Sequence, residues 1–214
     1  DAPPPSYTAI LDTTGELVIG AADMALYDRV RPDDILPLVP KNPAAVVIDA
    51  NFPASTLVAL GASLAAECRL FAAGTSPEKI VRLVPLLTRL DGLVLNRAEA
   101  IALAGDDAVD SATLAVGLAA QLRDGGCVLI SDGADNAVLA VGETVVTVKP
   151  PEITASSEIF VKNVNGAGDV MAGVFFCHWL DSDAQSLNTA TKMTEILTTA
   201  VAAGASFVAR KRSE

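Results

Sequence analysis

Several residue types are scarce in this sequence of 214 residues, and each shortage excludes a class of protein. Histidine occurs once, at His178, and the cysteines (Cys68, Cys127 and Cys177) form no Cys-x-x-Cys pair, so no zinc site is expected. An odd number of widely spaced cysteines in apolar surroundings predicts reduced core thiols of a cytoplasmic protein. We also expect His178, which lies in FFCHWL, to pack within a helix rather than to act in catalysis.

Positive charge is also in short supply. The chain has 15 Lys and Arg against 26 Asp and Glu, and its formal net charge is −11. Such a surface repels phosphate backbones, so we expect no nucleic-acid partner. No uninterrupted apolar stretch approaches the roughly 18 residues that cross a bilayer, and we expect no membrane contact. Aromatic residues make up 4%, which leaves Ala, Val, Leu and Ile to build the core.

Short β-rich segments alternate with helical ones along the chain. Strands are predicted at 44–51, 68–73, 92–96 and 127–133, and β-hairpins at 6–23 and 137–150. Helices are predicted at 53–67, 76–90, 97–105, 111–126, 166–180 and 186–209, with a short helix or turn at 31–40 and an interruption at Pro85. This alternation predicts one α/β domain over residues 1–214, with a mostly parallel sheet that helices cover on both faces.

Polar residues recur where the predicted strands end, which is where sheets of this kind bind ligands. Asp49 and Asn51 follow one strand, and they either bind substrate hydroxyls or cap the next helix. Thr75 and Ser76 follow another strand, and a helix cap explains them. The loop from Ser131 through Gly133 either binds a phosphate oxygen or forms a tight turn into the following hairpin.

Two further groups at strand ends carry the strongest chemical signal. Asn96 and Glu99 are three residues apart, so a helix places them on one face, where they either serve Mg²⁺ or form a capping box. Gly166-Ala167-Gly168-Asp169 precedes a long apolar helix. It either holds an anion at the helix N-terminus beside a carboxylate base, or it provides close helix packing with an ordinary first-turn aspartate.

Taken in order, NRAE (96–99), SDG (131–133) and NGAGD (165–169) resemble the hallmarks of the ribokinase-like (PfkB-type) carbohydrate and nucleoside kinases. Within that family, the chain is most similar to pseudouridine kinases at 7–24, 85–105 and 163–182. The resemblance implies a three-layer α/β/α sandwich with a small β lid, of which the hairpin at 7–22 is a part. It also implies a homodimer that forms through this lid.

The resemblance assigns roles residue by residue. Asp169 is implied as the base that accepts the proton of the sugar hydroxymethyl, and the backbone around Gly166, Ala167 and Gly168 as the anion hole. Asn96 and Glu99 are implied to organise Mg²⁺ and the phosphates of ATP. The nucleotide site is implied to include Ser131, Gly133 and Asn136.

The chain also departs from the family pattern. Asn165 stands where Thr or Ser is usual, and Asn136 where the nucleotide turn usually has Gly, which a left-handed Asn tolerates. FAAGTS (71–76) replaces a strand end with Asp-Pro. Asn163 and Val164 occupy places where ribokinases often have cation-supporting Asp and Thr, so strong activation by a monovalent cation is not expected.

The likeness covers only about the last two-thirds of a family member. The chain opens DAPPPSYTAI, and we expect it to be part of a longer protein that lacks here its N-terminal third. In the family that third supplies the Gly-Gly substrate loop and an aspartate that grips the sugar hydroxyls. We therefore expect the 214 residues alone to bind sugar poorly and to turn over slowly or not at all.

Three functions follow as hypotheses. The first is ATP-dependent phosphorylation of the 5′-hydroxyl of a ribosyl nucleoside, above all pseudouridine. The second is a kinase for another acceptor, such as ribose, fructose or adenosine. The third is a kinase-like module that binds a ligand or partner without catalysis.

Overall fold

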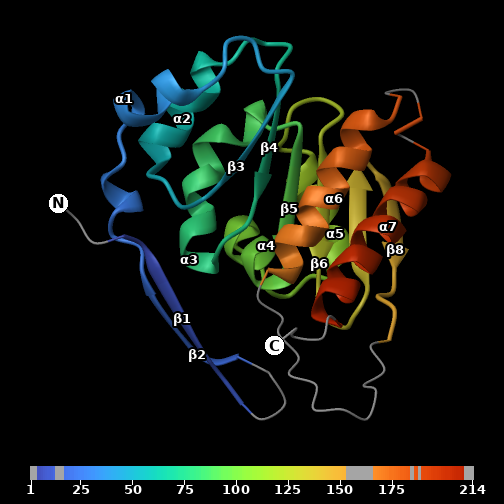
Figure 1. The fold of residues 1–214 in the computed structure, drawn as a ribbon. Helices are drawn as coiled ribbons and strands as arrows, with labels where there is room; N and C mark the ends of the chain where they lie inside the picture. Colours follow the sequence, from blue (N-terminus) through green and yellow to red (C-terminus); the bar gives the residue numbers. More distant parts are fainter. Residues whose placement is uncertain (1–3, 13–16, 153–165, 184–185, 188, 210–214) are drawn as a thin grey trace.

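A computed structural model describes residues 4–12, 17–152, 166–183, 186–187 and 189–209. They form a two-stranded sheet and a six-stranded sheet with helices on both faces of the larger one (Figure 1). The strands are β1 (Ser6–Leu11), β2 (Leu17–Asp23), β3 (Ala45–Asp49), β4 (Arg69–Ala73), β5 (Gly92–Asn96), β6 (Cys127–Ser131), β7 (Ala137–Val141) and β8 (Thr144–Val148). The α-helices are α1 (Pro32–Ile35), α2 (Ala54–Ser63), α3 (Pro77–Ile80), α4 (Arg97–Ala104), α5 (Ser111–Ala119), α6 (Ala167–Asp181) and α7 (Ala190–Val208).

The large sheet follows the order of the chain, β3-β4-β5-β6-β7-β8. The pairs from β3 to β6 are parallel, whereas β7 and β8 run antiparallel to their neighbours. Because each parallel crossover steps in the same direction and has the same hand, the connecting helices α2 to α5 all lie on one face. The α/β class and the mostly parallel sheet are therefore confirmed.

Side chains that alternate along the strands pack into two separate hydrophobic cores, one on each face of the large sheet. One face, with Leu70, Leu93 and Val128 among its residues, packs against α2 to α5. The other face, with Phe71 and Leu129, packs against α6 and α7. The period of two along each strand thus divides the apolar residues between the faces, and every central strand reads as a continuous apolar run.

The predicted helix at 76–90 changes character within its length. Ser76 caps it, since its side chain accepts a hydrogen bond from the Lys79 N–H at 3.3 Å. The α-helical part ends at Ile80, and a 3₁₀ segment, η3, continues through Val81–Arg89 and contains Pro85. Pro85 has no N–H to donate to the Val81 carbonyl, so an α-helix cannot run through this point. The predicted helix is therefore divided, but the division follows Ile80, and the 3₁₀ segment continues through Pro85.

The predicted helix at 111–126 is shorter than expected. The α5 helix ends at Ala119. Beyond it the Arg123 N–H donates to the Leu90 carbonyl at 3.1 Å, and the Gly126 N–H donates to the Arg123 carbonyl at 2.7 Å. These bonds draw the chain back to the sheet, so residues 120–126 of the predicted helix form a turn instead.

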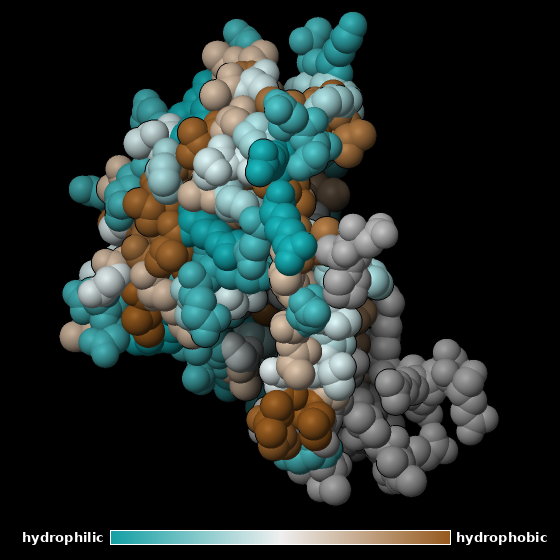
Figure 2. Space-filling view, turned by 90° about the vertical axis from the view of Figure 1, so that its left-hand side faces the viewer, coloured by the Kyte–Doolittle hydropathy of each residue, from teal (hydrophilic) through white to brown (hydrophobic). Residues whose placement is uncertain are grey.

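The hairpin of β1 and β2 stands apart from the large sheet (Figure 1). Tyr7, Ile10, Val18 and Ile19 are all exposed on it. Figure 2 shows the face of the molecule on which the hairpin lies, with apolar side chains gathered at the lower end of the view. The hairpin at 6–23 is confirmed as a structure, while its turn lies outside the described residues.

The prediction for one cysteine and for the histidine is wrong. Cys68 and Cys127 are buried as expected, but Cys177 is exposed, and so is His178. The core face of α6 is formed by Met171, Ala172, Phe175, Phe176 and Trp179. Residues 177 and 178 fall on the opposite arc of the helix and face solvent.

Within the described ranges, no helix is both long and apolar enough to cross a membrane.

Candidate active site

Three polar segments converge at the carboxyl ends of the central strands. In the register of β5 with β6, Asn96 stands opposite Ser131. The Ser131 hydroxyl donates to the Leu95 carbonyl at 3.4 Å. On the other side of β5, the Gly74 N–H extends the pairing of β4 by donating to the Val94 carbonyl at 2.8 Å. Three of the loops predicted from the sequence are thus brought to one edge.

Asn96 and Glu99 form a complete capping box at the start of α4. The Asn96 Oδ1 accepts from the Glu99 N–H at 2.9 Å, and the Glu99 Oε2 accepts from the Asn96 N–H at 2.9 Å. The capping alternative is therefore realised. It leaves Glu99 Oε1 without a bond inside the box, so one carboxylate oxygen is still able to accept from a ligand or a water.

Glu99 is a buried acid, with a relative exposure of only 4%. Removal of its carboxylate from water raises its pKa, the Asn96 hydrogen bonds lower it, and the negative charge of Asp169 raises it further. Among the described residues, no cation pairs with Glu99. Two carboxylates from distant parts of the chain thus interact, and no ion pair within the described ranges compensates either of them.

A glycine begins α6. Gly166 is its N-cap in a left-handed conformation (φ 86°), and among the described residues no side chain caps the helix. The first N–H bonded back into the helix is that of Val170, which donates to the Gly166 carbonyl at 3.0 Å. The donors of Ala167, Gly168 and Asp169 precede it, and an α-helix offers them no acceptor.

The C-terminal part of α7 supports this N-terminus from behind. A Cβ built on Gly204 would lie 3.1 Å from the Ala167 carbonyl oxygen, and one on Gly166 would lie 3.4 Å from the Phe207 ring. In contrast, a Cβ on Gly168 meets no heavy atom of the described residues within 4 Å. Gly168 and Asp169 are both exposed. The backbone at Gly168 is therefore open to the close approach of another molecule.

The loop between β6 and β7 carries the other predicted nucleotide residues. Gly133 has a left-handed backbone (φ 57°), but Asn136 does not, because Asn42 is the one non-glycine residue with positive φ in the described part of the chain. The expectation of a left-handed Asn136 is therefore wrong. The turn takes its left-handed residue three positions earlier, where a glycine is available.

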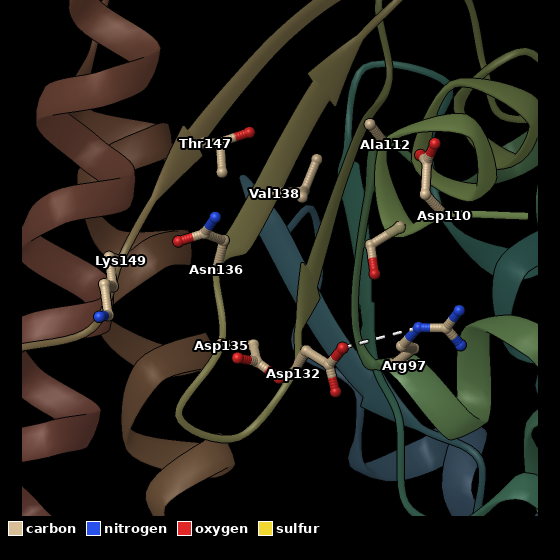
Figure 3. A pocket seen from close by; sticks show the side chains of 10 residues that line it. Arg97, Asp110, Ala112, Asp132, Asp135, Asn136, Val138, Thr147 and Lys149 are labelled. Carbon is tan, nitrogen blue, oxygen red and sulfur yellow. Dashed lines mark ion pairs between the residues drawn. The ribbon is translucent and has the colours of Figure 1, made fainter.

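Asn136 lines an open cavity of about 600 Å³ on the α5 side of the sheet (Figure 3). Arg97 lies on one side of it and Lys149 on the other. The Arg97 Nε is 3.6 Å from the Asp132 Oδ2, an ion pair that joins α4 to the loop after β6. Ser131 and Gly133 do not line this cavity, so it receives only one of the three predicted nucleotide residues.

Asp49 and Asn51 do not cap α2, whose N-cap is Pro53 with no side-chain hydrogen bond. Instead the Asp49 carboxylate accepts from the backbone and side-chain amides of Asn51, at 2.9 and 2.8 Å. The Asn51 Oδ1 in turn accepts from the Lys79 ammonium at 2.8 Å. The two residues are committed to contacts within the protein, and neither of the two roles predicted for them is needed to explain them.

Gly74 lies in a strand-end loop that the sequence indicated, but no role was predicted for the glycine itself. A Cβ at this position would lie 2.0 Å from Glu99 Oε2, so the Glu99 carboxylate occupies the space that a side chain would need. Arg97 and Lys149 were missed as well. For Arg97 a signal existed, because it lies inside the NRAE motif beside Asn96.

The side-chain oxygens of Asn96 and Glu99 suit Mg²⁺, but they are too few to coordinate the ion without other ligands. No group of three or more His, Cys, Asp or Glu residues able to hold a metal occurs in the part of the chain that the structure describes. Mg²⁺ usually keeps several waters and is shared between one or two carboxylates and the phosphates of a substrate. Glu99, whose Oε1 lies outside the capping box, and Asn96 fit that arrangement as ligands that act directly or through water.

Comparisons with known proteins identify the family to which this arrangement of strand-end residues belongs. The profile described as pfkB family carbohydrate kinase matches residues 2–213. A carbohydrate kinase from Agrobacterium tumefaciens is 34% identical, with a TM-score of 0.68 over 96% of this chain and 62% of its own. The ribokinase from Thermotoga maritima is 16% identical, with a TM-score of 0.69 over 97% and 64% of the two chains. No curated protein matches the chain.

A third structure, the adenosine kinase from Anopheles gambiae in complex with P1,P4-di(adenosine-5) tetraphosphate, is 19% identical, with a TM-score of 0.62 over 79% of this chain and 51% of its own. The chain belongs to the PfkB family of carbohydrate kinases, the ribokinase-like sugar and nucleoside kinases. It spans only about 62% of the length of the first solved relatives that it matches.

Residues 163–165, for which departures from the family were noted, lie outside the described residues.

Proposed function

We propose that this protein transfers the γ-phosphoryl group of ATP to the 5′-hydroxyl of a ribosyl nucleoside, pseudouridine above all. One observation carries the proposal. The exposed Asp169 lies in the first turn of a helix whose leading N–H groups have no acceptor within the helix, and its charge acts on the buried Glu99. Phosphoryl transfer to an alcohol needs this combination of donors for the phosphate charge and a carboxylate for the departing proton.

In the proposed reaction the substrate hydroxyl approaches the γ-phosphorus from the side of Asp169. A bond forms between the hydroxyl oxygen and phosphorus, the bond to the β-phosphate oxygen of ATP breaks, and the hydroxyl proton moves to the Asp169 carboxylate. The N–H groups of Ala167, Gly168 and Asp169 donate to the oxygens of the transferring group, and the helix dipole adds to their effect. The open space at Gly168 supports this role.

Asn96 and Glu99 orient the phosphates of ATP on the opposite side. Mg²⁺, when bound there, neutralises the charge that develops on the leaving group. The capping box holds both residues rigidly, because each accepts a hydrogen bond from the backbone of the other. Ser131, at the end of the neighbouring strand, and the turn at Gly133 are proposed to bind the nucleotide next to them, with Asn136 further along the same loop.

The choice of pseudouridine rests on the likeness of segments 7–24, 85–105 and 163–182 to pseudouridine kinases. Its acceptor site requires more than the described residues. Because the chain spans about 62% of its first solved relatives, we propose that full activity depends on the part of the family fold that it does not match. The 214 residues alone are then expected to turn over slowly or not at all.

The hairpin of β1 and β2 is proposed as a lid over the sugar and as the contact of a homodimer. Its exposed apolar residues Tyr7, Ile10, Val18 and Ile19 support both roles, since isolated two-stranded hairpins are only marginally stable in water. The free thiols and the small-molecule substrates support a cytoplasmic location.

The test measures ADP release with Mg·ATP and pseudouridine, uridine, adenosine or ribose. It uses the 214-residue chain and the longest polypeptide that its gene encodes. Asp169→Asn is expected to lower turnover by at least about 100-fold while Mg·ATP affinity stays nearly unchanged. Asp181→Asn, at the other end of α6, is the matched control and keeps full turnover.

Turnover with pseudouridine that disappears in Asp169→Asn supports the proposal as stated. Turnover with ribose or adenosine alone retains the mechanism and corrects the acceptor. A folded protein that binds Mg·ATP and phosphorylates none of the four acceptors contradicts the proposed reaction and favours a binding module without catalysis.

A further inference from the structure

Gly74 lies in the loop after β4, where Glu99 occupies the space next to its Cα. A Cβ added to Gly74 would come within 2.0 Å of Glu99 Oε2, 2.5 Å of Glu99 Cδ and 3.0 Å of Glu99 Oε1. All three distances involve the carboxylate group. Such short separations cannot persist, so the carboxylate and a residue-74 side chain exclude each other.

The backbone does not explain the glycine. Gly74 is absent from the described glycines with positive φ, which are Gly105, Gly125, Gly133, Gly142 and Gly166. Its N–H donates to the Val94 carbonyl at 2.8 Å, as it would in any residue that extends a parallel strand. A glycine that has neither a left-handed conformation nor an unusual bond is required here for the space that it leaves.

Glu99 has little freedom to move away. It is buried at the first turn of α4, and its Oε2 is bound to the Asn96 N–H at 2.9 Å. The Gly74 backbone is bound to Val94 in β5, the strand that leads into α4, so both sides of the contact are anchored to neighbouring paired strands. A side chain at position 74 therefore displaces the carboxylate from the capping box rather than the strand from the sheet.

We infer that Gly74 is a positioning residue, which fixes the Glu99 carboxylate in the capping box on the side of the edge that faces Asp169. This inference rests on the proposed function, in which Glu99 and Asn96 organise Mg²⁺ and the phosphates of ATP. Gly74 acts by leaving the space that the Glu99 carboxylate occupies, so that the carboxylate keeps the geometry that a binding site requires to within about half an ångström.

The first experiment needs no nucleotide. Hydrogen exchange of the Asn96 amide, followed by NMR, reports whether its bond to Glu99 Oε2 is intact. Gly74→Ala is expected to speed this exchange by roughly tenfold, the effect of losing one hydrogen bond. Gly117→Ala is the matched control, because a Cβ there meets nothing within 4 Å among the described residues, and it leaves the Asn96 amide unchanged.

The second experiment measures Mg·ATP binding by calorimetry. A further variant, Glu99→Asp, keeps the negative charge and changes only the space that the side chain occupies. Gly74→Ala is expected to weaken Mg·ATP binding by about tenfold or more, as loss of an orienting contact to a metal ligand does. Glu99→Asp shortens the side chain by one methylene and makes room for a Cβ at position 74. The double variant Gly74→Ala/Glu99→Asp is therefore expected to bind within about twofold of Glu99→Asp alone.

If the two substitutions instead weaken Mg·ATP binding by the product of their separate effects, the steric inference is wrong. It is also wrong if Gly74→Ala leaves both the Asn96 amide and the Mg·ATP affinity unchanged. Failure of the wild-type chain to bind Mg·ATP would count against the proposed function, and the exchange experiment would still decide the contact between Gly74 and Glu99.

Discussion

Asn96 and Glu99 each hold the backbone N–H of the other at 2.9 Å, so the start of α4 and the candidate metal site are the same structure. A cap and a ligand site make opposite demands in principle, since a side chain that bonds to the backbone has fewer free lone pairs. Here Glu99 retains one oxygen outside the box. Different substitutions of Asn96 and Glu99 can therefore measure the contribution of the capping box to stability separately from its contribution to Mg·ATP binding.

Asn96→Ala is expected to destabilise the protein by about 1 kcal/mol, because α4 loses its N-cap acceptor. It is also expected to weaken Mg·ATP binding. Ser76→Ala removes the cap of α3 and is expected to cost a similar amount of stability while Mg·ATP binding remains intact. Denaturant unfolding and calorimetry on both variants provide the comparison. Equal Mg·ATP affinity in the two variants would mean that Asn96 acts only as a cap.

Glu99→Gln is expected to change the dependence of stability on pH. Burial raises the pKa of Glu99, so the folded protein binds more protons than the unfolded chain between the usual carboxyl pKa and the raised one. The contribution of Glu99 to stability is therefore lost as the pH rises through this window.

Glutamine keeps an acceptor for the Asn96 N–H and carries no charge to bury. The melting temperature of Glu99→Gln relative to wild type should thus increase from acid toward neutral pH and then level off. Thermal unfolding between pH 4 and 8 measures this difference, and a difference that does not vary with pH speaks against a raised pKa.

Gly168→Ala is expected to stabilise the protein and to impair phosphoryl transfer. Alanine in a helix is favoured over glycine by roughly 0.5–1 kcal/mol, and a Cβ at this position meets no described atom. The same Cβ would stand where the proposed phosphoryl group approaches the backbone. Gly173→Ala, in the same helix and also in open space, should stabilise equally and leave turnover unchanged. Identical turnover in the two variants would remove the anion hole from the mechanism.

The cysteines are expected to differ sharply in reactivity. Cys177 is exposed, whereas burial raises the pKa of both Cys68 and Cys127 and holds them as inert thiols. Under native conditions an aromatic disulfide reagent should therefore modify only Cys177 rapidly, and in the variant Cys177→Ser it should modify no thiol rapidly. In guanidinium the reagent should modify all three cysteines of the wild-type protein. Fast modification of a second thiol in the native protein would contradict the burial of Cys68 and Cys127.

Local rules accounted for the features whose causes lie within a few residues. The box of Asn96 and Glu99, the cap at Ser76 and the loss of α-helix around Pro85 each depend on residues close together in the sequence, and each was predictable. The α/β pattern also predicted which polar segments follow strands. The resemblance to a kinase family depends on the order of these segments along the chain.

Features that depend on contacts between distant segments were not predictable. FFCHWL is apolar on nearly every side, so periodicity did not show that Cys177 and His178 face away from the sheet. Gly74 reads as an ordinary loop glycine until Glu99, far along the chain, is seen beside it. Asn136 likewise looked left-handed because the turn was aligned by resemblance, while the positive φ lies at Gly133.

The sequential strand order has a consequence for how the protein forms. The core beneath α2 to α5 contains buried residues only from Ile48 to Ala140, and each strand within it pairs with the next along the chain. The opposite core requires α6 and α7, from Met171 to Val201. During synthesis from the N-terminus, one face of the sheet is thus able to fold before the helix that carries Asp169 has left the ribosome. The N-terminus of α6, with the proposed base Asp169, then joins Asn96 and Glu99 only after that face of the sheet is able to form.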